Sequence, residues 1–449
     1  MKQRSILATA TAVGLGVAAC GAAVATVGSD ERIGTDAVEN TFEHVATADH
    51  EADLDADLDE LADHRLDVDA AGDDPRHDVD SRTSDGQWYR DIRMSRWTWL
   101  GADEASITDT LDRIAAANGN RTDPDLLDTI DTFGPGHWTY EFATAADAAA
   151  ARGDHREASA LSLIASYPHN DPDGAGGAAL AASIHQYELA AIADGHHVER
   201  ISLVVDGADV TALLHLPPVA TTAGPAPVMM ITGGIDVVLT EHYPYFRDHL
   251  APAGVATITF DIPGNGGSSD LVLDPDMDRV HVAVLDAIAA DDRLDPDRVA
   301  AMSMSGGGPA VVELAIDQSD RLVAAVNRCG VVASALGLPA EVYAAFPAMT
   351  IDTYAVRAGL EPGDLEGLAL ATGEIDLVER GLLGTGRPMT DVPILSVNTA
   401  DDDVAPLEDM ELVTAASTHG ELVVVGEEGH CAPDQSDADL IMDWVLDHL

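Results

Sequence analysis

The sequence has very few basic residues for its length. Of 449 residues, 23 are Lys or Arg and 79 are Asp or Glu, so the formal net charge is −56, and Lys2 is the one lysine. Such a surface repels nucleic acid and anionic membranes, and we expect no nucleic-acid partner. We interpret the acidic excess as a halophilic adaptation that keeps the surface hydrated at high salt.

Aromatic residues and cysteines are also scarce. Aromatics make up 4% of the chain, and the three cysteines are Cys20, Cys329 and Cys431. If Cys20 is modified, two cysteines remain, so no disulfide framework stabilises the fold. We expect buried free thiols at Cys329 and Cys431, and the sequence leaves their pairing open.

The N-terminus has the pattern of an export signal. Lys2 and Arg4 precede an apolar run over residues 5–19, and Cys20 ends it. This predicts a signal peptide over 1–20 with a lipobox-like end and lipidation at Cys20. An uncleaved helical anchor that runs on to Val27, or secretion, is the alternative. We therefore expect an exported, cell-surface protein that contacts the membrane only through an N-terminal lipid or anchor.

The rest of the chain changes character twice. Residues 21–86 are rich in Asp, Glu, His and Ala, and they predict a disordered acidic linker. Residues 87–197 hold four of the five tryptophans, and their apolar residues recur with a helical period, which predicts a helical N-terminal cap domain. From 198 onward, short β-branched runs alternate with helical ones, and the runs are 201–205, 211–215, 228–231, 255–260, 299–302, 322–326, 393–397 and 422–425.

Eight such strands alternating with helices predict an α/β fold with a doubly wound, mostly parallel eight-stranded sheet in a catalytic domain over 198–449. Residues 334–390 carry no strong strand pattern. They predict a helical lid insertion after the sixth strand.

A serine stands in a tight turn after the fifth predicted strand. Ser305 is followed by three glycines and then by a helical run, and Ser303 and Gly307 lie two residues to either side. A nucleophile elbow needs small residues there because neighbouring backbone passes close to a strained turn. The pattern predicts Ser305 as a nucleophile and the Gly306 N–H as one oxyanion donor.

Glycine-rich loops follow the third and fourth predicted strands. The first contains Gly233 and Gly234, and we expect a second oxyanion donor from the N–H of Gly234 or Ile235. The second, over 261–268, lacks the third glycine and the first-strand position of a dinucleotide-binding loop. We interpret it as a tight loop that borders the active site.

The order of the remaining candidates supports a catalytic triad. Asp402 follows the seventh predicted strand, and His430 follows the eighth, so Ser, Asp and His occur in the chain order typical of this chemistry. Asp401 and Asp403 are alternatives to Asp402. The predicted fold is thus the α/β-hydrolase fold.

Residues from about 88 to 449 resemble the FrsA-like family of α/β hydrolases, which includes 2,6-dihydroxypseudooxynicotine hydrolase and fungal pigment-pathway hydrolases. The resemblance rests on the segments 97–103, 135–140, 198–200, 233–236 and 261–264 and on the elbow. It implies a helical N-terminal domain that covers the catalytic one and a hydrolase activity directed at carbonyl groups. Ser303 in place of the usual glycine and the exported acidic extension are departures from the family.

We expect a serine carboxylesterase that works through an acyl-enzyme, with a small-molecule ester or ketone as substrate. A C–C bond hydrolase of acylated aromatics, a serine peptidase and a non-catalytic surface lipoprotein that binds a ligand are the alternatives. We expect no cofactor and no metal, because the Asp-rich run at 53–59 lacks the glycine turn and closing Glu of a calcium loop. A homodimer is compatible with the sequence.

Overall fold

The computed structural model describes residues 88–117, 133–218, 224–426, 429–432, 435 and 437–449. The predicted signal peptide 1–20, with Cys20, and the whole of the predicted linker 21–86 lie outside the described residues, as does residue 87. None of the helices in the described part of the chain has the length and apolar character needed to span a bilayer.

One eight-stranded sheet organises the chain after the N-terminal helices, as predicted. Its strand order is β1-β2-β4-β3-β5-β6-β7-β8. The hairpin β1–β2 and the pair β2–β4 are antiparallel, and the other neighbours are parallel. The strands are β1 (His197–Val205), β2 (Ala208–Leu216), β3 (Ala226–Thr232), β4 (Ala256–Phe260), β5 (Leu294–Met304), β6 (Ala324–Arg328), β7 (Ile394–Asn398) and β8 (Gly420–Val424).

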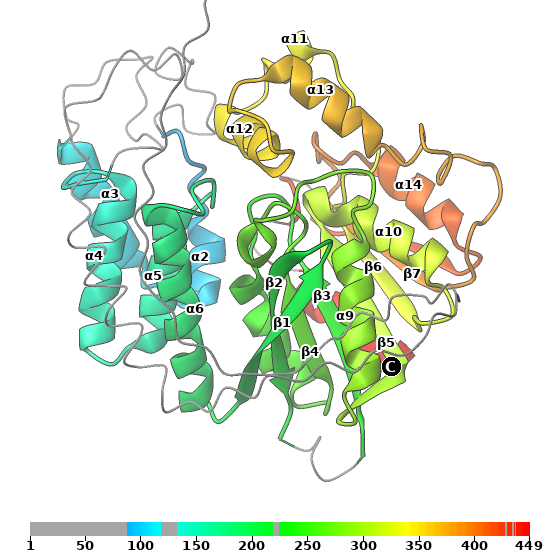
Figure 1. Cartoon of the computed structure of the whole chain (residues 1–449), viewed down its shortest axis with the longest axis horizontal. Helices are drawn as coiled ribbons and strands as arrows, with labels where there is room; N and C mark the ends of the chain where they lie inside the picture. The colour runs from blue at the N-terminus through cyan, green and yellow to red at the C-terminus, as the bar shows by residue number, and fades with distance from the viewer. Residues whose placement is uncertain (1–87, 118–132, 219–223, 427–428, 433–434, 436) are drawn as a thin grey trace, which may run out of the picture. The chain divides into compact units, whose positions relative to one another are not determined.

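Both faces of the sheet are covered, which explains why its strands read as continuous apolar runs. Along β3, Val228 and Met230 join the apolar cluster formed with α9 (Arg279–Ala290), α10 (Gly308–Asp317) and α14 (Leu407–Ala416). The alternate residues Met229 and Ile231 join the opposite cluster, which contains residues of α6 (Ala175–Ala193) and α15 (Ala438–His448). Figure 1 shows α9 and α10 together on one side of the strands.

The N-terminal helices share an apolar cluster around tryptophan, and α6 also packs on the sheet. They are α2 (Met94–Leu100), α3 (Glu104–Ala117), α4 (Trp138–Ala151), α5 (His155–Ser166) and α6. Trp97 and Trp138 are almost fully buried, with ring centroids 6.1 Å apart. Arg93 and Arg96, at the start of α2, form ion pairs with Asp236 (2.6 Å) and Glu241 (2.5 Å), so this cluster is joined to the loop after β3.

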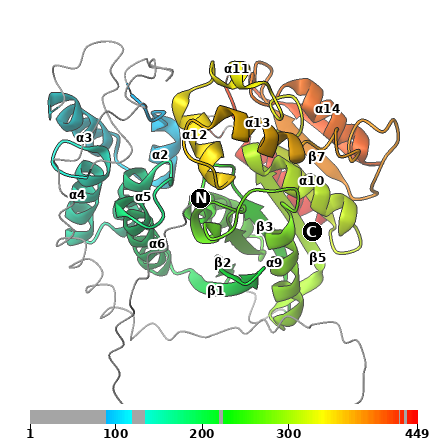
Figure 2. The same cartoon turned by 45° about the horizontal axis from the view of Figure 1, so that its top comes forward.

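The predicted helical insertion lies between β6 and β7. Its helices are α11 (Ala340–Tyr343), α12 (Ala348–Arg357) and α13 (Leu365–Glu374), drawn in yellow and orange in Figure 2. The remaining short elements are η2 (Leu239–His242), α8 (Tyr243–Tyr245), η3 (Phe246–Leu250), η4 (Gly266–Ser268) and η5 (Ser305–Gly307).

The expectation of free thiols is wrong. Cys329 and Cys431 form a disulfide, with Cα atoms 5.1 Å apart and a separation of 102 positions in the sequence. Cys329 follows β6 and Cys431 follows β8, and both lie at the carboxyl edge of the parallel strands. The sheet topology brings the two cysteines together, and their spacing in the sequence does not predict this pairing.

Candidate active site

Ser305 lies in a strained turn between β5 and α10. Its φ is +51°, a left-handed value that non-glycine residues seldom adopt. A Cβ on Gly307 would lie 2.4 Å from the carbonyl oxygen of Gly233, so that position requires glycine. The strand, turn and helix predicted around Ser305 are all present.

Ser303, which takes the place of the first glycine of a typical nucleophile elbow, is accommodated by polar neighbours. Its buried hydroxyl lies 2.5 Å from Thr232 Oγ1 and 3.2 Å from His281 Nε2. Burial lowers the pKa of His281 to about 3, so this imidazole is neutral at pH 7. The Ser303 hydroxyl therefore has hydrogen-bond partners, whereas Nδ1 of His281 has none among the described residues.

His430 connects Ser305 to Asp402. Its Nε2 lies 2.8 Å from Ser305 Oγ, and its Nδ1 lies 2.7 Å from Asp402 Oδ2. Asp402 is buried, whereas Asp401 and Asp403 are exposed. Of the three aspartates considered, the structure brings Asp402 to the histidine.

The Asp402 carboxylate is held in its charged form. Burial raises its pKa, but the hydrogen bond and charge of His430 and the N–H groups of Ala405 and Val404 outweigh burial, so the pKa lies below its ordinary value. Those two N–H groups donate to Oδ1 at 2.9 and 2.8 Å. One carboxylate oxygen is thus fixed by backbone, and the other is free to orient the imidazole.

The histidine loop is anchored on both sides of His430 by residues that the sequence did not reveal. Thr399 Oγ1 donates to the carbonyl oxygen of Gly429 at 2.6 Å. The fully buried Arg328 donates to the carbonyl oxygens of Cys431 (2.6 Å) and Ala432 (3.2 Å) and is ion-paired with Asp437. With the disulfide, these contacts hold the backbone immediately before and after the imidazole.

The disulfide also bears on metal binding. Among the residues that the structure describes, Cys329, His430 and Cys431 are the group whose donor atoms lie close enough together to share a metal ion. Both sulfurs are joined to each other here, which leaves no thiolate for a metal.

The loop after β3 approaches the serine as closely as glycine allows. A Cβ on Gly234 would lie 2.7 Å from Ser305 Cβ and 3.2 Å from the nitrogen of Gly306. Asn265 donates to the carbonyl oxygen of Gly234 at 3.1 Å. The predicted donors Gly306, Gly234 and Ile235 are therefore assembled beside Ser305.

Arg357, at the end of α12, supports the same loop from the helical insertion. It donates to the carbonyl oxygens of Ile235 (2.8 Å), His169 (3.0 Å) and Pro168 (2.8 Å). Burial lowers the pKa of this guanidinium to about 10. One side chain thus connects the β3 loop, the insertion and the N-terminal helices.

The glycine-rich loop over 261–268 folds back on its own aspartate. The N–H of Gly267 donates to Asp261 Oδ2 at 2.7 Å, and a Cβ on Gly264 would lie 2.5 Å from the carbonyl oxygen of Arg357. Asp261 is completely buried, and burial raises its pKa to about 7. This loop borders the site, as predicted.

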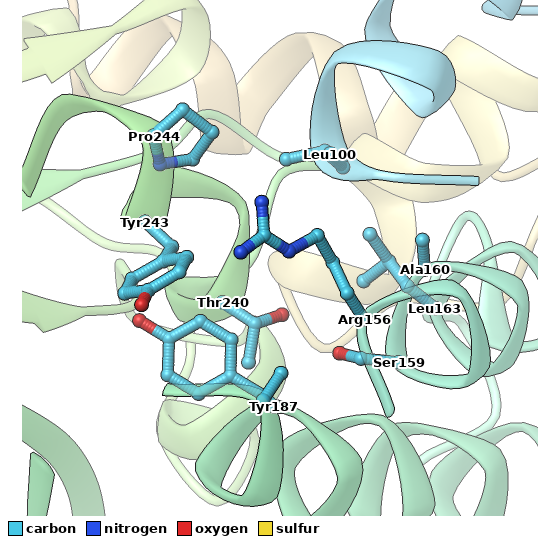
Figure 3. Close-up of a pocket in the computed structure, with 10 residues that line it drawn as sticks. Leu100, Arg156, Ser159, Ala160, Leu163, Tyr187, Thr240, Tyr243 and Pro244 are labelled. Carbon is cyan, nitrogen blue, oxygen red and sulfur yellow. The ribbon is translucent and has the colours of Figure 1, made fainter. Parts of the chain in front are cut away.

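A separate small cavity lies where α5 and α6 meet the segment around Tyr243 (Figure 3). Its volume is about 20 Å³, which is room for one water molecule and too little for a substrate. It is lined by the hydroxyl-bearing Thr240, whose Oγ1 has no hydrogen-bond partner in the described part of the chain. None of Ser305, Asp402 and His430 lines it.

Comparison with known proteins identifies the family. The family model described as "Esterase FrsA-like" matches residues 68–449. Esterase FrsA of Escherichia coli (strain K12) is 34% identical over 350 residues, which cover 75% of this chain and 83% of that protein. The chain belongs to the FrsA-like esterase family. The resemblance noted from the sequence is thereby confirmed.

Solved structures show the same fold. AbyA5 aligns with a TM-score of 0.60 at 24% identity, over 71% of this chain and 90% of that one. The 2,6-dihydroxy-pseudo-oxynicotine hydrolase aligns with a TM-score of 0.59 at 20% identity, over 79% of this chain and 95% of that one. As a member of the FrsA-like family, the chain is an α/β hydrolase with esterase-like activity.

Proposed function

We propose that this chain hydrolyses small-molecule carboxylic esters through an acyl-enzyme on Ser305. The observation that carries the proposal is the continuous hydrogen-bond line from Ser305 Oγ through His430 to Asp402, at 2.8 and 2.7 Å. The serine has a positive φ and follows a central strand, and it faces an imidazole that a buried carboxylate orients. This is the arrangement that acyl transfer requires.

In this mechanism His430 Nε2 takes the proton of Ser305 as Oγ attacks the ester carbonyl. Asp402 stabilises the imidazolium that forms, and the histidine then gives the proton to the departing alkoxide. A water molecule, activated by the same histidine, attacks the acyl-serine and releases the carboxylic acid. No metal or cofactor step is needed.

The backbone N–H groups of Gly306 and Ile235 hold the oxyanion. The position that a Cβ of Gly306 would occupy lies 3.5 Å from the nitrogen of Ile235, so the two N–H groups border one small space next to Ser305. Gly234 keeps that space open because it has no side chain. Donors that are already in place stabilise the developing charge without a cost of reorganisation.

Ser305→Ala tests the nucleophile. We expect turnover of short p-nitrophenyl esters to fall on the order of 10⁶-fold and labelling by a fluorophosphonate to disappear. The matched control is Ser396→Ala on β7, because the Ser396 hydroxyl is buried without a hydrogen-bond partner among the described residues and lies outside the site. Full turnover in the Ser305→Ala protein would refute the proposal.

The same assay separates the alternatives. Hydrolysis of aryl ketones in preference to aryl esters would favour C–C bond cleavage, and cleavage of peptide amides would favour a peptidase. A folded protein that neither turns over esters nor reacts with the fluorophosphonate would indicate a binding protein. Because the acidic composition predicts a need for salt, each measurement is made at low and at molar salt.

A further inference from the structure

One hydroxyl beside the proposed oxyanion donors makes no hydrogen bond within the described part of the chain. Tyr354 projects from α12, and its Oη is buried without a hydrogen-bond partner among the described residues. A buried hydroxyl that makes no hydrogen bond costs folding free energy. Such a group in a native structure calls for an explanation outside folding.

The position of this hydroxyl suggests an explanation in the chemistry of the site. The point at which a Cβ of Gly306 would stand lies 3.0 Å from Tyr354 Oη and 3.5 Å from the nitrogen of Ile235. Bond lengths place the same point about 2.5 Å from the nitrogen of Gly306 itself. The hydroxyl therefore borders the space that the two backbone N–H groups border.

Gly306 is what makes room for the hydroxyl. Any side chain at this position would collide with Ile235 Cγ2 at 2.7 Å and with Tyr354 Oη at 3.0 Å. A side chain at position 306 would therefore require Ile235 to shift and Tyr354 to move by a few tenths of an ångström. The elbow and the helical insertion are matched to each other at this contact.

From this placement we propose that Tyr354 is a third oxyanion donor, a catalytic residue supplied by the helical insertion. This rests on the proposed ester hydrolysis at Ser305. The Tyr354 O–H donates a hydrogen bond to the carbonyl oxygen of the substrate, and that bond strengthens as the oxygen becomes negative in the tetrahedral intermediate. The proton stays on the phenol throughout, and the covalent steps remain those of the serine and the histidine.

The ionisation state of the phenol agrees with this role. Burial raises the pKa of Tyr354 above its ordinary value, and the nearby Tyr343 and Asp236 raise it further. The group is thus a neutral donor at pH 7. A phenolate in this place would repel the oxyanion.

Tyr354→Phe is the decisive variant, and Tyr343→Phe is its matched control. Tyr343 lies in the same insertion, but its hydroxyl donates to the carbonyl oxygen of Ala335 (3.0 Å) and pairs with Thr372 Oγ1 (2.8 Å). We expect Tyr354→Phe to lower kcat for p-nitrophenyl esters by about 10- to 1000-fold with little change in KM. Its melting temperature should not fall, because it loses no hydrogen bond.

Tyr343→Phe should show the opposite pattern, with wild-type kcat and a lower melting temperature. As a second readout, the inhibition constant of an aryl trifluoromethyl ketone, which forms a tetrahedral oxyanion on the serine, should rise in Tyr354→Phe by the factor that kcat/KM falls. The inhibition constant of the corresponding methyl ketone, which stays trigonal and accepts only the weaker hydrogen bond of the neutral carbonyl, should rise far less.

Wild-type kcat in Tyr354→Phe would overturn the proposal. So would a loss of kcat in which the inhibition constants of the two ketones rise by the same factor. Neither result would touch the nucleophile, which Ser305→Ala tests separately. Activity that survives Ser305→Ala would instead refute the ester mechanism itself.

Discussion

Replacing Asp402 by Asn tests the proposed triad at the residue for which the sequence offered three candidates. The side chain of Asp402 is fully buried, with Oδ2 on His430 Nδ1 and Oδ1 on two backbone N–H groups. Asn is nearly the same shape, and its amide oxygen can keep the two backbone hydrogen bonds. Its NH₂ group then faces the imidazole in place of the carboxylate oxygen.

The magnitude follows from the tautomer that this change imposes. An NH₂ group donates, so Nδ1 must accept, and the ring proton moves to Nε2. A protonated Nε2 cannot take the proton of Ser305, which lies 2.8 Å away. The corresponding change in a serine protease lowers kcat by about 10⁴-fold, equivalent to about 5 kcal/mol of transition-state stabilisation, and we expect a loss of this size.

The assay is steady-state turnover of a p-nitrophenyl ester by Asp402→Asn, with Asp401→Asn and Asp403→Asn as controls. Both control side chains are exposed and should leave kcat unchanged. The melting temperature should be close to wild type in all three proteins, since the backbone hydrogen bonds to Asn persist. A large loss of kcat in either control, or a small one in Asp402→Asn, would refute the assignment.

Other consequences of the geometry can be measured with the same substrate. Gly234→Ala should remove most activity because its methyl would stand 3.1 Å from the serine Oγ, whereas Gly373→Ala on α13, whose methyl meets nothing closer than 3.5 Å, should retain it. Opening the disulfide by the double change Cys329→Ser and Cys431→Ser should lower the free energy of unfolding by about 2–5 kcal/mol and also lower kcat, since the loop that holds the histidine loses an anchor. Urea unfolding and ester turnover measure the two effects, and unchanged values of both would contradict the prediction. Burial raises the pKa of Asp261 to about 7, so the folded protein holds a proton that the unfolded chain has lost by about pH 4, and stability should fall as the pH rises through this window. Asp261→Asn should reduce that slope, and an identical slope in both proteins would count against the assignment.

The sheet is readable from the sequence because parallel strands covered on both faces need unbroken apolar runs. Boundaries are less readable. β5 begins at Leu294, five residues before the predicted run. The prediction missed these residues because Asp295 and Asp297 are partly or fully exposed and show no apolar pattern. Helix α2 lies within the region 87–197 that is predicted to be helical, but its seven residues are too few to place its ends from a helical period.

The serine, aspartate and histidine are predictable because each follows a predicted strand in a fixed order. The supporting residues are not. Arg357 bonds a carbonyl oxygen 122 residues away, and Arg328 bonds one 103 residues away. Every residue has a backbone carbonyl group. The sequence therefore does not show which carbonyl oxygen an arginine binds. Tyr354 has no partner among the described residues at all.

Two buried arginines therefore have the same task in two loops that contribute to the proposed site. Arg328 holds the histidine loop and Arg357 holds Ile235, each through backbone carbonyl oxygens. For Arg357, removing the guanidinium from water costs several kcal/mol, which carbonyl dipoles offset only in part, and its lowered pKa reflects that deficit, whereas the charge of Arg328 is also paired with Asp437. An apolar side chain of similar size would pack at the Arg357 position at less cost. Such a side chain could not fix the position of a loop, because apolar contacts have no preferred direction. Three hydrogen bonds from one planar guanidinium group are directional and can fix it. We infer that these arginines contribute position more than stability, as preorganised catalysis requires.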